Sequence, residues 1–558
     1  METIYENDFQ TVYEPEWLLP DEKGKPVCSF IPIAIKVTKG SNTSESPTFV
    51  TLRLTFANGE YLETNVDYDE IETLKWSRID SRCMINSHYR GAGKYIANII
   101  RASMAKAPLE EKKFISHLGI NRFCDNIVFF AGDRVIAPSS AKINASDYIW
   151  REGAFHLNID ENISKMDAFN GLAELMNLCP DVSHIILAHT VAGIIRAAFE
   201  EVKYFPNTVL AIIGKTGILK SHYVSLLAQL YNRSEYIRPA TRFNSTNRFI
   251  EDTICNHREC TVVIDDIHSG ESKSIMQANK NTAEDIVRRV GDNTGRGRKE
   301  GNASVQHQFH GNVVFIGEHT FGKDSTIPRM LMLNLDKAPD GGILDKYQRK
   351  LPLLVSTFYY YFIQWYVENF NDICKRIDNN LSNFRAQNVQ AAVHRRFLDD
   401  QFYLQISYWF FLEYCKDSGF FSDETAKSMY SDFEEYLSEI ILQNQAQLDV
   451  DENPSKDANY LKIVRKLYQD GKFNLASDIK HFNSEVHDGL IYYDCLCLRG
   501  DKVDEKIRKK IYTAERKDWV NFLQGKNALK IEGGGKKSIQ IYGSHGIRFY
   551  AIYLHKLK

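Results

Sequence analysis

The feature that most constrains this chain is a turn rich in glycine, lysine and serine, placed directly after a buried apolar strand. The run Val209–Ile213 is entirely apolar, and Gly214-Lys-Thr-Gly-Ile-Leu-Lys-Ser221 follows it. Many proteins bind the phosphates of a nucleoside triphosphate with a buried strand, such a turn and a helix in succession. The pattern therefore predicts an α/β core with a phosphate-binding loop.

Each position of the loop has an expected task. Gly214 allows the tight turn, and Gly217 lets backbone N–H groups approach the phosphates. Lys220 would reach the β- and γ-phosphates of ATP, and Ser221 would offer its hydroxyl to Mg²⁺. The expected nucleotide-binding residues are Gly214, Lys215, Thr216, Gly217, Ile218, Leu219, Lys220 and Ser221. Leu219 departs from the standard pattern, in which a glycine precedes the lysine.

Three further motifs follow in the order of a single ATPase core. Thr261–Asp266 is a β-branched strand that ends in two acids. Asp265 would hold Mg²⁺ through water, and Asp266 is expected to activate the attacking water. A third strand, 313–318, ends at Glu318, which could sense the γ-phosphate, and Arg329 then precedes an apolar strand. Each motif alone also suits an ordinary strand and turn, but together they predict ATP hydrolysis.

Composition excludes several classes of protein. The chain has 558 residues, a net charge of −3 and 25% charged residues, which is an ordinary globular profile. The acidic opening is not expected to be a secretory signal, and the apolar stretches 185–199 and 353–370 contain polar or charged residues, so we expect no membrane span. Ten scattered cysteines without a CxxC pair favour a reduced, cytoplasmic setting.

The residue patterns divide the chain into five segments. Residues 1–115 are predicted to form a small α+β module, and 116–200 a lead-in whose helical part packs on the ATPase sheet. The ATPase core is expected over 201–345. Residues 346–445 have helical periodicity and many aromatic residues, which indicate core packing. A polar link then leads to a last domain, 451–558.

The last domain is basic. It contains 21 Lys and Arg against 14 Asp and Glu, a net of +7, which leaves −10 for the rest of the chain. Its predicted helices are followed by strands over 528–532 and 538–542, around a tip that carries Lys536 and Lys537. This is the pattern of a winged helix whose helix and wing bind DNA. A winged helix that contacts only protein, or an evenly charged surface, also fits.

With these motifs in place, the chain resembles AAA+ ATPases of the MCM-like helicase group, and more closely the Cch-type helicases of staphylococcal cassette chromosome mobile elements. Four features support the resemblance: a non-glycine at 219, the run Phe243-Asn-Ser-Thr-Asn-Arg-Phe-Ile-Glu251, the pair Gly317-Glu318, and the apolar strand after Arg329. Two positions depart from the family pattern: an Asp-Asp pair replaces the usual Asp-Glu, and Glu318 replaces a sensor asparagine.

The resemblance implies an ATP- and Mg²⁺-dependent DNA helicase, built as a hexameric ring that moves 3′ to 5′ and serves replication of a mobile element. It implies that 346–445 form a helical lid and that Arg329 is an arginine finger acting on the neighbouring subunit. Arg395 or Arg396 could be a sensor in the lid, although an exposed basic pair is equally consistent with the sequence. The shorter Asp266 could slow hydrolysis, or another residue could position the water.

The insert Gly291–Gly301 distinguishes a helicase from a generic ATPase. In ring helicases of this group, a hairpin before the third strand points into the central channel. Here glycines allow a reversal, and Arg296, Arg298 and Lys299 supply cations for the phosphates of single-stranded DNA. A surface loop is the alternative.

Three functions therefore remain open at this stage. The first is a ring-forming DNA helicase. The second is an AAA+ remodeller or initiator that melts or loads DNA without processive unwinding. The third is a nucleotide-switched DNA-binding protein with residual hydrolysis.

Overall fold

The structure is a computed structural model of the 558-residue chain. It describes residues 3–6, 11–13, 16–41, 48–123, 126–141, 143–150, 156–228, 230–231, 239–267, 273–300, 303–306, 308–318, 326–335, 337–346, 350–388, 393–451, 460–509, 516–532, 535–544 and 546–557. The chain forms two compact units. The first comprises Met1–His117, Asn121–Phe130 and Ala137–Gly153, and the second comprises Leu118–Ile120, Ala131–Ile136 and Ala154–Lys558. The five segments predicted from the sequence stay a prediction.

The first unit is built on a five-stranded sheet in the order β12-β8-β5-β6-β7. Helix α1 (Ala92–Met104) contacts β5, and its buried side chains join a core that includes Phe30 and Trp76. The strands of this unit are β1 (Thr3–Glu6), β2 (Thr11–Tyr13), β3 (Leu19–Pro20), β4 (Pro26–Cys28), β5 (Ile31–Gly40), β6 (Thr48–Thr55), β7 (Tyr61–Asp67), β8 (Leu109–Ile115), β10 (Asn126–Phe130) and β12 (Tyr148–Trp150). Strands β9 (Gly119–Phe123) and β11 (Val135–Ile136) pair with β10.

The second unit contains a five-stranded sheet in the order β14-β15-β18-β13-β19, and its strand pairs are parallel. Its strands are β13 (Val209–Ile213), β14 (Thr241–Arg242), β15 (Thr261–Ile267), β18 (Asn312–Gly317) and β19 (Met330–Asn334). Every residue of β13 and β18 is buried, as expected for apolar strands covered on both faces. The order inserts β18 between the phosphate-loop strand and the acidic strand.

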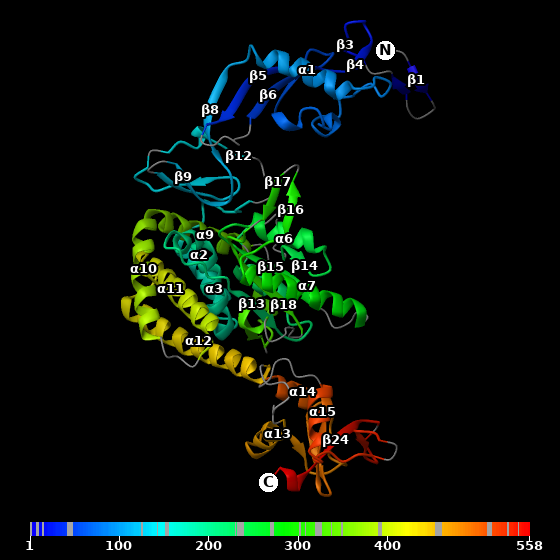
Figure 1. The fold of residues 1–558 in the computed structure, drawn as a ribbon, viewed down its shortest axis with the longest axis vertical. Coiled ribbons are helices and arrows are strands. Elements are labelled where there is room, and N and C mark those ends of the chain that lie inside the picture. The colour runs from blue at the N-terminus through cyan, green and yellow to red at the C-terminus, as the bar shows by residue number, and fades with distance from the viewer. Residues whose placement is uncertain are drawn as a thin grey trace. The chain divides into compact units, whose positions relative to one another are not determined.

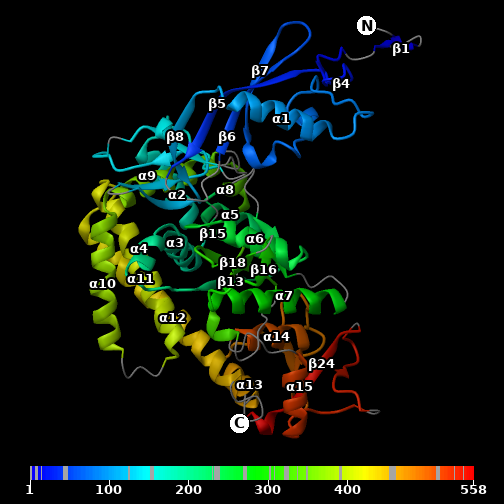
Figure 2. The same cartoon turned by 45° about the horizontal axis from the view of Figure 1, so that its top comes forward.

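Helices cover both faces of this sheet. Figures 1 and 2 show α2, α3 and α9 to α12 on one side and α6 and α7 on the other. The helices are α2 (Lys165–Met176), α3 (Pro180–Ile194), α4 (Arg196–Glu201), α5 (Lys220–Ala228), α6 (Asn247–Asn256), α7 (Lys273–Gly291), α8 (Gly341–Lys346), α9 (Leu351–Glu368), α10 (Phe370–Gln387), α11 (Arg395–Asp417) and α12 (Asp423–Asp451). The predicted helices over 165–200 and 346–445 are confirmed as helices. No helix among the described residues is long and apolar enough to cross a membrane.

Buried polar side chains fix the helical group to the sheet. Asn444 of α12 accepts a hydrogen bond from the Met332 backbone N–H and donates one to the Met332 carbonyl, at 2.9 and 3.1 Å. Strand β19 is an edge strand, so the asparagine amide substitutes for a missing neighbouring strand. Tyr403 of α11 donates to Asn312 Oδ1 of β18 at 3.1 Å. The helices therefore pack on the sheet in a defined register.

The predicted hairpin between α7 and β18 is present. Strands β16 (Gly297–Glu300) and β17 (Ala303–Gln306) pair antiparallel, with Gly297 opposite Gln306.

The C-terminal domain contains more sheet than a winged helix requires. Helices α13 (Tyr460–Gln469), α14 (Gly500–Arg508) and α15 (Arg516–Gly525) lie where helices were predicted. A five-stranded sheet in the order β20-β21-β22-β24-β23 accompanies them. Its strands are β20 (Leu475–Ala476), β21 (Gly489–Tyr492), β22 (Cys495–Arg499), β23 (Ile539–Gln540) and β24 (Arg548–Tyr553). The two predicted wing strands do not pair with each other, because both Leu529 and β23 bond to β24.

Candidate nucleotide-binding site

The phosphate loop is a strained turn at the carboxyl end of β13. A side chain at Gly214 would place its Cβ 2.6 Å from the Leu335 carbonyl oxygen, so only glycine fits this close approach. Gly217 has φ +82°, a conformation that glycine adopts without cost. Leu219 has φ +59°, which costs a non-glycine residue about 1–2 kcal/mol. The leucine that departs from the standard sequence thus adopts a glycine-like backbone.

Lys220 begins α5 and is almost buried. Its side chain is held over the loop, where Nζ donates to the Lys215 carbonyl at 2.5 Å. Burial lowers the pKa of Lys220, and the carboxylates of Glu318 and Asp265 act in the opposite direction. The ammonium therefore lies between backbone and carboxylate oxygens, in the place where a triphosphate would supply negative charge.

Ser221 and Asp265 meet across two elements. The Ser221 hydroxyl donates to Asp265 Oδ1 at 2.8 Å. The β15–β18 register shifts between Ile264 and Ile267, which places one extra residue in β15 at the acidic pair. Such a bulge bends the strand and re-aims its side chains, and bulges are common beside active sites.

A hydroxyl and a carboxylate are the oxygen ligands that Mg²⁺ prefers, and Mg²⁺ bound with nucleotide uses few protein ligands. Among the described residues, no group of three or more His, Cys, Asp or Glu side chains could hold a metal by itself. The Ser221–Asp265 pair therefore fits an ion that completes its shell with phosphate oxygens and water.

Glu318 contacts the phosphate loop directly. It follows β18, and its Oε1 accepts a hydrogen bond from the Thr216 hydroxyl. The negative charge of Glu318 also partly offsets the lowering of the Lys220 pKa that burial causes. Asp266 lies in β15, but its side chain is outside the described residues.

Arg329 is held by an ion pair within the chain. Its Nη2 lies 2.9 Å from Asp292 Oδ1, and Nε donates to the same oxygen at 3.1 Å. Arg396 of α11 donates to Asp292 Oδ1 at 3.1 Å. Burial would raise the pKa of Asp292, but hydrogen bonds from Arg329 and Arg396 outweigh it and the pKa lies below its ordinary value. The predicted finger and one predicted lid arginine thus share a carboxylate that sequence reasoning did not single out.

The base of the hairpin is anchored by acidic residues. Buried Glu251 of α6 accepts from the Arg296 backbone N–H at 2.6 Å and from Arg289 Nη1 at 3.2 Å. Arg296 Nη2 lies 2.8 Å from Asp285 of α7. The Arg296 guanidinium is therefore engaged within the chain through Nη2, and its predicted role in DNA binding stays a prediction. The backbones of Arg298 and Lys299 lie in β16, but their side chains are outside the described residues.

The two predicted C-terminal DNA-binding lysines are adjacent and directly follow Gly535. Lys536 forms a backbone bridge with Glu532, and Lys537 Nζ donates to Asn521 Oδ1 at 2.6 Å. Neither lysine lines the cavity that Arg499, Arg516 and Arg548 form in the same domain.

Comparison with known proteins identifies the fold. No protein-family model and no curated protein matches the chain. A solved structure described as SCCmec type IV Cch, an active helicase, matches over 95% of both chains with a TM-score of 0.53 and 12% identity. A JCV helicase bound to a thiazolopyridine compound matches with a TM-score of 0.25 and 10% identity, over 44% of this chain and 67% of that chain. The apo C-terminal region of NrS-1 gives the same TM-score and identity over 73% and 87%.

At a TM-score of 0.25 the last two likenesses carry no argument. The first supports the resemblance predicted from the sequence, at the level of fold. Over nearly its whole length, the chain is similar in fold to a Cch helicase.

Proposed function

We propose that this chain is an ATP-driven DNA helicase that works as a ring and serves replication of a mobile element. The observation that carries the proposal is the junction of Lys220, the Ser221–Asp265 pair and Glu318 at the carboxyl ends of neighbouring parallel strands. This is the arrangement that phosphoryl transfer needs, because catalysis there is mostly positioning and charge neutralisation.

In this proposal, the loop backbone and Lys220 hold the β- and γ-phosphates of ATP. Ser221 and Asp265 would hold Mg²⁺, which when bound neutralises charge on the phosphate oxygens. Thr216 keeps the Glu318 carboxylate beside the loop. Helices α9 to α12 would be the helical part of an AAA+ module.

We assign the water-positioning role to Glu318 together with Asp266. Glu318 has a longer side chain than an aspartate and a fixed hydrogen-bond partner in the loop. A general base must lie within hydrogen-bond reach of the water it activates. Asp265 would then supply metal binding, and Asp266 and Glu318 would position the water, with Glu318 accepting its proton.

Coupling to DNA would use the hairpin and Arg329. The Arg296 backbone N–H bonds to Glu251 of α6 and its side chain pairs with Asp285 of α7, so motion of those helices would be transmitted to the hairpin base. Asp292 follows α7 directly and holds Arg329. In an assembled ring, Arg329 would leave Asp292 for the γ-phosphate of the neighbouring subunit.

Strand displacement on a forked DNA duplex tests the proposal against the remodeller, which would hydrolyse ATP without unwinding. Wild-type chain should displace the strand with Mg²⁺ and ATP, and Lys220→Ala should not. A mixture of Lys220→Ala and Arg329→Ala subunits should regain part of the activity, because mixed rings contain intact composite sites. Full hydrolysis by a strictly monomeric preparation would contradict the ring.

A further inference from the structure

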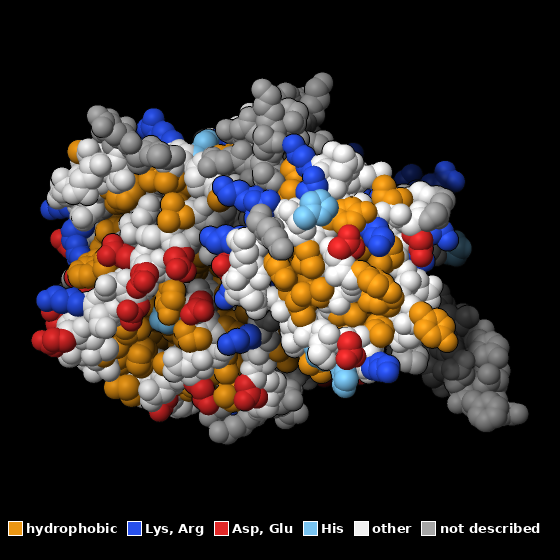
Figure 3. Space-filling view, turned by 90° about the horizontal axis from the view of Figure 1, so that it is seen from below, with side chains coloured by type: hydrophobic (Ala, Val, Ile, Leu, Met, Phe, Trp, Pro, Cys, Tyr) orange, Lys and Arg blue, Asp and Glu red, His pale blue; other side chains and the backbone are white. Residues whose placement is uncertain are grey.

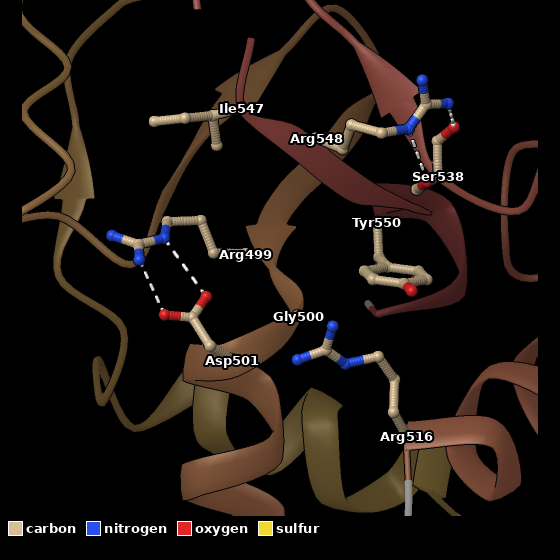
Figure 4. Close-up of a pocket in the computed structure, with 8 residues that line it drawn as sticks. All are labelled: Arg499, Gly500, Asp501, Arg516, Ser538, Ile547, Arg548 and Tyr550. Carbon is tan, nitrogen blue, oxygen red and sulfur yellow. Dashed lines mark hydrogen bonds and ion pairs between the residues drawn. The ribbon is translucent and has the colours of Figure 1, made fainter. Parts of the chain in front are cut away.

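The C-terminal domain contains a cavity of about 370 Å³ whose lining is unusually rich in arginine. It is lined by Arg499, Gly500, Asp501, Arg516, Ser538, Ile547, Arg548 and Tyr550. Three arginines against one aspartate give this lining a net charge of +2. The volume lies in the range of about 300–1,000 Å³ typical of small-ligand sites. Figure 4 shows the arginines approaching from three sides, with the Tyr550 ring between Arg516 and Arg548.

The lining comes from four elements that meet at one end of the sheet. Arg499 ends β22, Gly500 begins α14, Arg516 begins α15 and Arg548 begins β24. Because β22 and β24 are antiparallel, the end of one lies beside the start of the other. Residues far apart in sequence are thereby gathered around a single space.

Carboxylates orient the arginines and leave donors for a ligand. Arg516 uses Nε and Nη2 on Asp504, at 2.8 and 2.6 Å, and Asp504 also accepts from Trp519 Nε1. Arg548 uses Nε on the Ser538 hydroxyl and Nη2 on Glu532. Among the described residues, the Nη1 group of neither arginine has a hydrogen-bond partner. A guanidinium carries five donors, so each remains able to bind an oxyanion.

Gly500 makes room for the two side chains that would hold a ligand. A Cβ at this position would lie 2.7 Å from Tyr550 Cε2 and 2.8 Å from Arg516 Cζ. Both side chains therefore depend on the absence of a side chain at 500. The Tyr550 ring packs edge-on against Trp519, with centroids 4.9 Å apart, which fixes its plane.

We propose that this cavity binds a phosphate group of a single DNA strand, with the adjoining nucleotide against Tyr550. Guanidinium groups suit phosphate oxygens, and an aromatic ring in a basic groove suits any base. The surrounding domain carries a net charge of +7. On the face shown in Figure 3, Lys and Arg side chains are interspersed with acidic and hydrophobic ones, so surface charge alone does not select a site. The inference rests on the proposed function, and it replaces Lys536 and Lys537 as the main DNA contact of this domain.

The test is the affinity of the full chain for a labelled single-stranded oligonucleotide, measured by fluorescence anisotropy over a range of salt. Arg516→Ala with Arg548→Ala should weaken binding about ten-fold, equivalent to roughly 1.4 kcal/mol. The salt slope should fall by roughly 0.7, the value expected for the loss of one phosphate contact on a single strand. Lys472→Ala is the matched control, because it removes a positive charge from the same domain outside the cavity. Binding by the control should stay within about two-fold of wild type, well below the change expected for lost charged contacts.

Two further variants distinguish loss of a DNA contact from loss of the folded domain. Arg516→Lys keeps a cation beside Asp504 but removes the planar fork, so it should weaken binding without lowering the melting temperature. Asp501→Asn removes the acidic group of the lining and releases Arg499, with which it pairs at 2.7 Å, so it should strengthen binding. Opposite effects at neighbouring positions cannot arise from loss of the fold.

Unchanged DNA binding in the Arg516 and Arg548 variants would overturn the proposal. A second result would also overturn it: inorganic phosphate or a mononucleotide binds the cavity in calorimetry, while the Arg516 and Arg548 variants bind DNA like wild type. The ligand of the cavity would then be a small phosphate compound. Hydrolysis of ATP by the wild-type chain without DNA reports on the proposed function separately. If the wild-type chain does not hydrolyse ATP, the ATPase assignment is refuted. If it hydrolyses ATP but the Arg516 and Arg548 variants bind DNA normally, only the proposed DNA-binding role of the cavity is refuted.

Discussion

Replacing Glu318 by glutamine tests the chemistry of the site most sharply. The variant keeps the size of the side chain and an oxygen to accept the Thr216 hydrogen bond, and it removes the negative charge. If Glu318 accepts the proton of the attacking water, turnover should fall by about 10²–10⁴-fold, the usual contribution of general-base catalysis. ATP should still bind, because removal of an anion beside the triphosphate does not weaken phosphate contacts.

The same variant has an expected effect on pH dependence. Burial lowers the pKa of Lys220, and Glu318 is the first of two carboxylates that raise it. A protonated Lys220 is needed to hold the phosphates, so ATP binding is present below the pKa of Lys220 and lost as the pH rises through it. Without the Glu318 charge the pKa falls further, and the alkaline loss of ATP binding should move to lower pH.

Steady-state hydrolysis and fluorescent-nucleotide binding, each measured across pH, check both expectations. Asp266→Asn is the companion variant, because Asp266 was predicted from the sequence to activate the attacking water. Turnover of Glu318→Gln within about two-fold of wild type, with Asp266→Asn inactive, would show that Glu318 is only a sensor, since a lost general base costs far more.

The remaining predictions concern strain, DNA and the arginine finger. Leu219→Gly should raise stability by roughly 1 kcal/mol, seen in thermal melting, because the backbone has φ +59°; a lower melting temperature would contradict this. Replacing Arg298 and Lys299 by alanine should lower the salt slope of single-strand binding by roughly 1.4 and abolish unwinding. If this variant unwinds DNA as fast as the wild-type chain, the hairpin is only a surface loop. Asp292→Asn should raise DNA-independent ATP hydrolysis several-fold, equivalent to roughly 1 kcal/mol, because Asp292 would no longer compete with the γ-phosphate for Arg329. Slower hydrolysis would mean that Asp292 instead positions Arg329 for catalysis.

Local patterns predicted much of the ATPase core. The turn after Val209–Ile213 and the acidic strand are encoded by neighbouring residues, so both could be predicted directly from the sequence. The hairpin was predicted from its glycines and cations together with the resemblance to ring helicases, and the structure contains it. Its register came from the structure.

The rest depends on contacts between distant residues. The ion pairs of Asp292 with Arg329 and Arg396 join residues 37 and 104 positions apart, and no pattern in the sequence marks them. In the C-terminal domain, β22 pairs with β24 about fifty residues later, so two short apolar runs gave no signal of a shared sheet. The arginine cavity exists only because that sheet forms.

The most direct test of the central claim is ATP hydrolysis with Mg²⁺, measured with and without single-stranded DNA for the wild-type chain and Lys220→Ala. Hydrolysis by the wild-type chain should rise when DNA is added, and Lys220→Ala should be inactive under both conditions, because no other cation is held over the loop by a backbone carbonyl among the described residues. Undiminished hydrolysis by Lys220→Ala would contradict the assigned site, and wild-type hydrolysis indifferent to DNA would contradict a DNA-driven motor.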